Sequence, residues 1–201
     1  MKANTASRTA QYMALFRAVE TGLPKSKRLF TDPYAIYFLD RGLQRVTKFS
    51  KIPLVGYFIQ KLIHNKGIGA ISSGIARTKF IDDLLESTIK EGCLQLIILG
   101  AGFDTRSLRL SFLKNISIIE IDHPDTSNLK INVLGKTVER LPENLIFEQV
   151  DFNKQSLHDL SQNGKINFSV PTTIIWEGVT NYLTKEAIDN TFAFRVAIAK
   201  R

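Results

Sequence analysis

Two glycines and an acid about twenty residues apart are the residues of this sequence best suited to chemistry. An apolar run ends in Gly100 and Gly102 within LIILGAGFDTR at 96–106, and the next apolar run ends at Asp122 within EIDHP at 120–124. In a parallel α/β sheet, glycines after one strand let backbone approach a nucleotide, and an acid after the next strand binds the ribose. The pattern predicts a nucleotide pocket.

The glycine motif departs from the dinucleotide pattern. A third glycine is missing, and Asp104, Thr105 and Arg106 follow instead. Dinucleotide sites use that glycine in the loop that holds a pyrophosphate. A ligand without phosphates does not require the third glycine. The departure favours S-adenosylmethionine over NAD. Glu120 shares a strand face with Asp122 and is a rival ribose acid, but Asp122 is nearer the carboxyl end of the strand and is preferred.

Two further strand ends carry polar or aromatic residues. Asp151 could accept a hydrogen bond from an adenine amino group and Phe152 could lie on the ring; a strand-end Asp and a core Phe are equally good interpretations. Glu177 follows the fourth apolar run, where a carboxylate would face a charged sulfonium and amino group. Its alternative role is a cap for the next helix, for which Thr184 is better placed.

Arg77 lies on one helical stripe with Ile81 and Leu84, so its guanidinium requires an anionic partner. A ligand carboxylate or a nearby acid such as Asp82 would serve. The three histidines and Cys93 show no metal-ligand spacing, and no Ser-His-acid or Cys-His arrangement stands out. We therefore predict no metal site and name no catalytic residue.

Alternating strands and helices must position these residues. Strands are expected over 94–99, 116–121, 145–150 and 173–176, with helices over 105–113, 127–140 and 154–162. Repeated βα units predict an α/β fold with a parallel sheet covered by helices, whose carboxyl strand ends share one edge. Residues 91–201 form this Rossmann-like core, and residues 1–90 form a helical segment that covers cofactor and substrate, together one domain.

The helical segment shows three local signals. Ala14, Leu15, Ala18 and Val19 recur at helical spacing, and Asp32 before Pro33 is a helix cap. A longer helix opens near Ser72, with an apolar stripe expected to comprise Ala76, Phe80, Leu84 and Ile89.

Composition and charge narrow the function classes. The chain has 201 residues, 44% hydrophobic and 23% charged, which is typical of one globular domain. One cysteine and no apolar leader favour the cytoplasm, and no stretch is long enough to enter a membrane. Residues 1–80 carry 14 Lys and Arg against three acids, a charge of +11, but no nucleic-acid motif. A small-molecule partner is expected; the oligomeric state is not readable.

Together these motifs resemble the leucine carboxyl methyltransferase-like family of S-adenosylmethionine-dependent enzymes. The matching pieces run in family order: Arg17-Ala18-x-Glu20, Asp32-Pro33-Tyr34-Ala35, ARTxxIDD at 76–83, ILGAGFDTR, EIDHP, Asp151-Phe152 and WEGVTNYLT at 176–184. The resemblance implies methyl transfer to a carboxylate or hydroxyl oxygen of a small molecule. It also implies cofactor contacts by Arg77, Gly100, Gly102, Asp122, Asp151, Phe152 and Glu177, with Lys27 as a weaker match.

The carboxyl-terminal end departs from the family. Members continue beyond the WEG strand with three more strands, whereas this chain ends in AFRVAIAKR. The resemblance therefore implies a truncated sheet that lacks its last strands. One alternative to an active enzyme is an inactive remnant, and a less favoured one is an NAD-dependent oxidoreductase.

Overall fold

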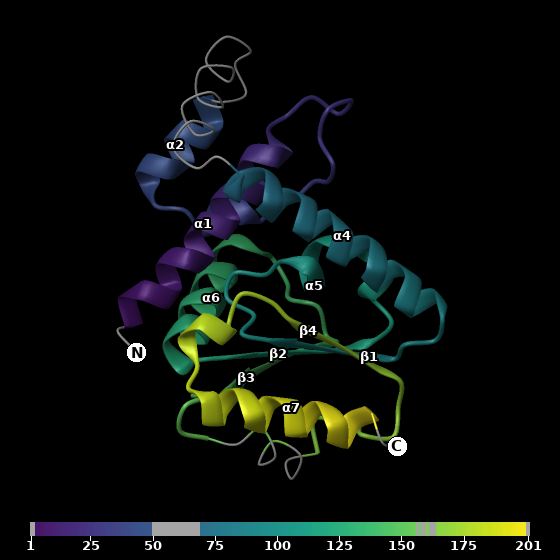
Figure 1. Ribbon diagram of the computed structural model, residues 1–201. Helices are drawn as coiled ribbons and strands as arrows, with labels where there is room; N and C mark the ends of the chain where they lie inside the picture. Colours follow the sequence, from purple (N-terminus) through teal and green to yellow (C-terminus); the bar gives the residue numbers. More distant parts are fainter. Residues whose placement is uncertain (1–2, 50–68, 156, 158–159, 161–163, 200–201) are drawn as a thin grey trace.

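A four-stranded parallel sheet with helices on both faces forms the body of the molecule (Figure 1). The computed structural model describes residues 3–49, 69–155, 157, 160 and 164–199. The strands are β1 (Gln95–Leu99), β2 (Ser117–Asp122), β3 (Leu145–Gln149) and β4 (Thr172–Trp176). Each lies within one residue of its expected bounds, and the predicted α/β class is confirmed.

The strand order is β3-β2-β1-β4. The chain therefore adds β2 and β3 on one side of β1 and then crosses over to add β4 on the other side. Leu99 pairs with Ile121 of β2 on one side and with Trp176 of β4 on the other. In open α/β sheets such a crossover leaves a crevice at the carboxyl ends of the strands, where ligands bind. Gly100, Asp122 and Glu177 all follow directly from these strand ends or lie on them.

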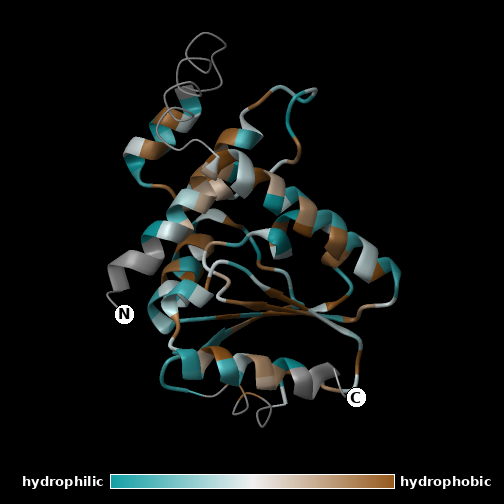
Figure 2. Ribbon diagram, viewed as in Figure 1, coloured by the Kyte–Doolittle hydropathy of each residue, from teal (hydrophilic) through white to brown (hydrophobic). Residues whose placement is uncertain are grey.

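Burial on both faces explains the continuous apolar runs of the two central strands, β1 and β2. Leu96 and Ile98 of β1 pack toward Leu85 of α4 (Ala70–Lys90), and Ile97 and Leu99 pack toward Phe194 of α7 (Lys185–Ala199). Parallel strands covered on both sides read as unbroken apolar segments because neither face meets water. Figure 2 shows the hydrophobic residues concentrated in the strands, between α4 and α7.

The helices after β1 and β2 differ from their expected bounds. The segment expected as one helix over 105–113 forms α5 (Arg106–Arg109) and a 3₁₀ turn, η2 (Ser111–Leu113), because Leu110 is extended and packs on the core. Helix α6 (Pro124–Thr137) begins three residues before its expected start, since Pro124 suits the first helical position and His123 Nδ1 accepts from the Asp125 N–H. Most of the helix expected over 154–162 falls outside the described residues.

The amino-terminal helices pack above the glycine loop. Ala14, Leu15, Ala18 and Val19 of α1 (Ala3–Thr21) are buried as expected. Asp32 Oδ1 accepts from the N–H groups of Tyr34 and Ala35, so it caps a 3₁₀ turn, η1 (Ala35–Phe38), rather than a longer helix. The ring of Phe38 stacks on Phe103 after β1 at 4.7 Å. Helix α2 (Arg41–Phe49) follows.

The apolar stripe predicted for α4 was wrong. Phe80 and Leu84 are 66% and 54% exposed, and Ala76 is exposed as well, whereas Ile89 is half-buried. The buried residues of α4 are instead Gly74, Thr78, Asp82 and Leu85. The reason is tertiary: Gly74 meets Phe16 and Met13 of α1, and Asp82 faces two guanidinium groups.

Among the described residues, no helix is long and apolar enough to cross a membrane.

Candidate functional site

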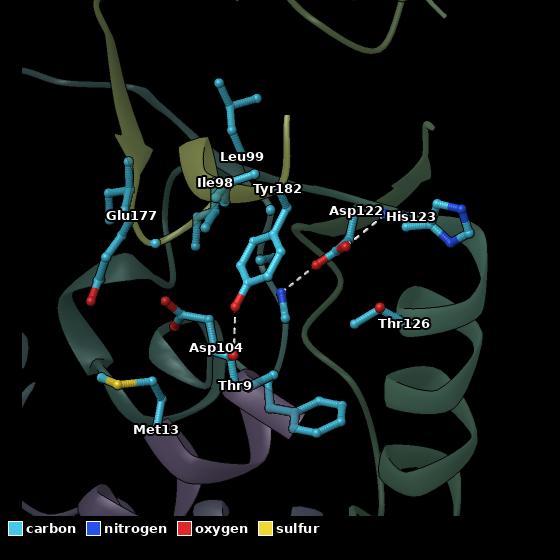
Figure 3. Close-up of a pocket in the computed structure, with 18 of the residues that line it drawn as sticks. Thr9, Met13, Ile98, Leu99, Asp104, Asp122, His123, Thr126, Glu177 and Tyr182 are labelled. Atoms are coloured by element: carbon cyan, nitrogen blue, oxygen red, sulfur yellow. Dashed lines mark hydrogen bonds between the residues drawn. The ribbon is translucent and has the colours of Figure 1, made fainter. Parts of the chain in front are cut away.

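A pocket opens at the carboxyl ends of the four strands, between the sheet and α1 (Figure 3). Residues that follow all four strands line it, as do side chains of α1 and α4. All seven residues predicted for the site lie along its wall: Arg77, Gly100, Gly102, Asp122, Asp151, Phe152 and Glu177. Lys27 does not; it is exposed in the turn after Pro24.

The glycine loop has backbone that other residues adopt only with strain. Gly100 and Gly102 have φ values of +66° and +51°. A Cβ on Gly100 would lie 2.1 Å from Cγ2 of Val179, so the loop after β4 packs directly against the glycine. The N–H groups of Gly100 and Ala101 donate to the carbonyl of Ile121, which closes the turn against β2. Glycine is therefore required at position 100 for both conformation and space.

Asp122 and Glu120 have different environments. Asp122 lines the pocket, where its carboxylate accepts hydrogen bonds from the backbone N–H groups of Gly102 and His123. Glu120 is 2% exposed beneath α6, where it accepts from Lys130 and Ser107. Burial raises the pKa of both carboxyl groups, although the hydrogen bonds oppose this for Asp122 and Lys130 opposes it for Glu120. Geometry therefore leaves Asp122 as the acid available to a ligand.

The residues after β3 form the far wall of the pocket. Asp151 lies near Lys154, with Nζ 3.1 Å from Oδ2, and accepts from the Asn153 N–H. Burial is the largest single effect and opposes ionisation, but the contacts with Lys154 and Asn153 together outweigh it and lower the pKa of Asp151. His123 Nε2 lies 3.6 Å from the same carboxylate. Phe152 lines the pocket and also packs against the core below the sheet, so it is a core residue, and its contact with an adenine stays a prediction.

Arg77 and Glu177 are brought together across the pocket. Nε of Arg77 donates to Oε1 of Glu177 at 2.6 Å, and the side chains are 44% and 20% exposed. Asp82, the nearby acid proposed as an alternative partner for Arg77, pairs with Arg106 and Arg109 instead. Thr184, not Glu177, accepts from the Ala187 N–H in the first turn of α7, as expected for its cap.

A buried chain of charges continues inward from this pair. It joins four guanidinium groups and four carboxylates from α1, the turn before η1, α4, the glycine loop, α5 and the loop after β4: Arg17, Asp32, Arg109, Asp82, Arg106, Asp104, Glu177 and Arg77. Its centre is Arg106, 3% exposed, whose guanidinium contacts Asp82 at 2.8 Å, Asp104, and Glu177 at 3.6 Å. Buried charges require such mutual pairing because desolvation is costly.

Comparison with known proteins gives a match that includes all of these residues. Residues 10–196 match the leucine carboxyl methyltransferase family.

The chain belongs to the leucine carboxyl methyltransferase family.

Individual relatives agree with this assignment. A Streptomyces coelicolor protein, provisionally named an S-adenosyl-L-methionine-dependent methyltransferase, is 30% identical over 90% of this chain and 61% of its own length. A Frankia alni protein with the same provisional name is 29% identical over the same shares. A Bacillus subtilis protein so named is 34% identical over 56% of this chain and 37% of its own. The chain thus spans about three fifths of the length of the first two relatives.

Sequence reasoning about this leucine carboxyl methyltransferase family member missed the charged chain as a unit. Arg17, Asp32, Asp82 and Arg106 all occur in the motifs that carry the family resemblance, which was the available signal. No spacing along the sequence indicated that they would meet, because four separate elements contribute them.

It also missed a contact over the pocket. Oγ1 of Thr9 in α1 lies 2.5 Å from the hydroxyl of Tyr182, which ends a 3₁₀ turn, η4 (Thr180–Tyr182), after β4 (Figure 3). Asn153 Oδ1 accepts from the N–H of Thr184, so the loops after β3 and β4 are joined as well. In this leucine carboxyl methyltransferase family member, α1 and η4 therefore meet over the site.

Proposed function

We propose that this chain forms the S-adenosyl-L-methionine pocket of an O-methyltransferase that acts on a carboxylate or hydroxyl of a small molecule. The observation that carries the proposal is the order of polar groups across the sheet. Strand order places Glu177 after β4, the glycine loop after β1, Asp122 at the end of β2, and Asp151 after β3. The cofactor has an amino-acid end, a ribose and an adenine in one line, and the pocket wall offers matching groups in the same spatial order.

Each end of the pocket supports a separate part of the assignment. Arg77 and Glu177 supply opposite charges for a carboxylate and an ammonium group. Asp122 lies beside the glycine loop, where a carboxylate can accept from two vicinal hydroxyls. Asp151 and Phe152 offer an acceptor and an aromatic face for adenine. The missing third glycine and the family match favour this ligand over NAD.

The chemistry of methyl transfer makes few demands on acid–base groups. Bound cofactor supplies an activated methyl group on a sulfonium. A carboxylate acceptor is already nucleophilic, so the protein's contribution is to align the acceptor oxygen with the methyl carbon and to exclude water. The contact of Thr9 with Tyr182 joins α1 to η4 at the pocket wall, which supports such a role.

Calorimetric titration of this chain with S-adenosylhomocysteine, S-adenosylmethionine and NAD tests the cofactor assignment. We expect both adenosyl ligands to bind and NAD not to bind; tighter binding of NAD would refute it. Transfer of a labelled methyl group to a panel of small carboxylic acids and alcohols then tests the reaction. Binding of cofactor without transfer to any acceptor in the panel would favour a binding remnant over an active enzyme.

A further inference from the structure

A second carboxylate, Asp104, lies on the same side of the pocket as Glu177. Asp104 lines the pocket, and its side chain is 12% exposed. Figure 3 shows Asp104 and Glu177 on one side and Asp122 with His123 on the other. The motifs of the sequence drew attention to the glycines and to Asp122, and no role was predicted for Asp104.

Arg106 fixes the position of both carboxylates. Its backbone N–H donates to Oδ1 of Asp104 at 2.7 Å, and its Nη1 contacts Oδ2 of Asp104 and lies 3.6 Å from Oε2 of Glu177. On the opposite edge, its Nε donates to Asp82 at 2.8 Å. A carboxylate has about four acceptor positions in all, so these contacts leave capacity on Asp104 for a ligand.

Charges around Asp104 keep it ionised. Its burial opposes ionisation, but Arg106 of α5, Lys130 of α6 and Arg17 of α1 outweigh burial and hold the pKa of this carboxyl well below its usual range. The acid that faces it from β2, Glu120, is itself paired with Lys130. The pocket thus presents an ionised carboxylate, held by Arg106 at low exposure, where attraction to a further cation is less screened than in water.

A zwitterionic ligand fits the charge arrangement better than a simple ion. Four guanidinium groups and four carboxylates form the cluster, so a ligand that carries both signs leaves its balance unchanged. If a ligand carboxylate pairs with Arg77, Glu177 loses that partner at 2.6 Å and keeps Arg106 at 3.6 Å, so a cation in the place of Arg77 would restore its close pairing. An ammonium between Glu177 and Asp104 supplies that cation.

We propose that Asp104, positioned by Arg106, is a cofactor-binding residue that shares the ammonium group of the methyl donor with Glu177. The inference rests on the proposed function, because the ligand is the cofactor assigned there. It adds a binding residue and defines the amino-acid end of the pocket as a site built for a zwitterion.

Asp104→Asn tests the role, because the amide keeps an oxygen that can accept from the Arg106 N–H but removes the charge. We compare its affinity for S-adenosylhomocysteine with its affinity for 5′-methylthioadenosine, which has the same nucleoside and thioether but no amino-acid end. We expect an affinity loss of about tenfold or more for the first ligand, and of no more than about twofold for the second. Asp83→Asn, an exposed acid of α4 paired with Lys79, is the matched control and should alter neither affinity.

Equal losses for both ligands would show that Asp104 has only a structural role, and no loss for either would show that it does not contact the ammonium group. Both outcomes overturn the inference while leaving the cofactor assignment intact. Failure of the unsubstituted chain to bind S-adenosylhomocysteine would instead overturn the proposed function and, with it, the inference. Should Asp104→Asn not fold, Asp104→Ser retains an oxygen at the same turn, and the same comparison of ligands decides.

Discussion

Gly100 and Val179 are in direct contact: a Cβ built on the glycine would lie 2.1 Å from Cγ2 of the valine. Gly100 begins the turn after β1, and Val179 precedes η4 after β4. The loops after these neighbouring strands are thus packed together at the wall of the pocket, and the site depends on a residue without a side chain at position 100.

We expect Gly100→Ala to lower the free energy of unfolding by more than about 2 kcal/mol, because strain at positive φ adds to the overlap with Val179. Chemical denaturation measures the loss. Gly135→Ala is the matched control: Gly135 lies in α6, no atom lies within 4 Å of its added Cβ, and alanine should stabilise the helix by about 0.5–1 kcal/mol. Equal stability of the two variants would contradict the close contact at Gly100.

Substitutions should distinguish the roles of Glu120 and Asp122, the two acids of β2. Asp122→Ala is expected to weaken binding of S-adenosylhomocysteine by about 1.5–3 kcal/mol, the range for hydrogen bonds to a charged group. Glu120→Ala leaves Lys130, 1% exposed, without its partner and is expected to lower the free energy of unfolding by about 3–5 kcal/mol. Calorimetry and denaturation measure the two effects. A loss of affinity in a stable, folded Glu120→Ala, with Asp122→Ala unaffected, would reverse the assignment.

Arg77→Met should reduce cofactor affinity more than stability. Methionine keeps part of the apolar stem but loses the guanidinium that would bind the ligand carboxylate, so an affinity loss of about tenfold or more is expected. The pair with Glu177 is partly exposed and contributes little to folding. Lys79→Met, on the same helix and paired with Asp83, controls for loss of a positive charge. A large fall in melting temperature with unchanged affinity would assign Arg77 a structural role only.

Cofactor affinity should fall with decreasing pH through ionisation of Asp122. Burial raises the pKa of Asp122 above its ordinary value of 3.8, even though the N–H groups of Gly102 and His123 oppose the rise. In the proposed site the ionised form would accept the ribose hydroxyls, so affinity should be complete above the raised pKa and should be lost as pH falls through it. Asp104 stays ionised over this range, because its pKa is lowered.

Titration of S-adenosylhomocysteine at a series of pH values between neutral and mildly acidic measures this dependence. Asp122→Asn should bind more weakly at neutral pH and should lose the part of the dependence that Asp122 causes. Any slope that survives in the variant belongs to other groups. An unchanged slope would show that Asp122 does not control binding in this range.

Local patterns in the sequence were sufficient to predict the strands and the residues of the pocket wall that follow them. The four apolar runs became β1 to β4, most clearly in β1 and β2, whose inner residues are buried on both faces and are mostly apolar. Gly100, Gly102 and Asp122 could be placed at the pocket because parallel strands end at a common edge. The helix after β1 was less predictable, since packing of Leu110 on the core interrupts it.

Only the tertiary structure decided which distant residues meet. The position of β4 beside β1, rather than beside β3, brings Glu177 to Arg77 and Val179 to Gly100. Crossings of α1, α4 and α5 turn Asp82 inward and leave Phe80 exposed, against the apolar pattern of the helix. Sequence spacing fixes neighbours on one helix or strand, whereas pairing of charges from separate elements depends on how those elements pack, and that depends on the whole core.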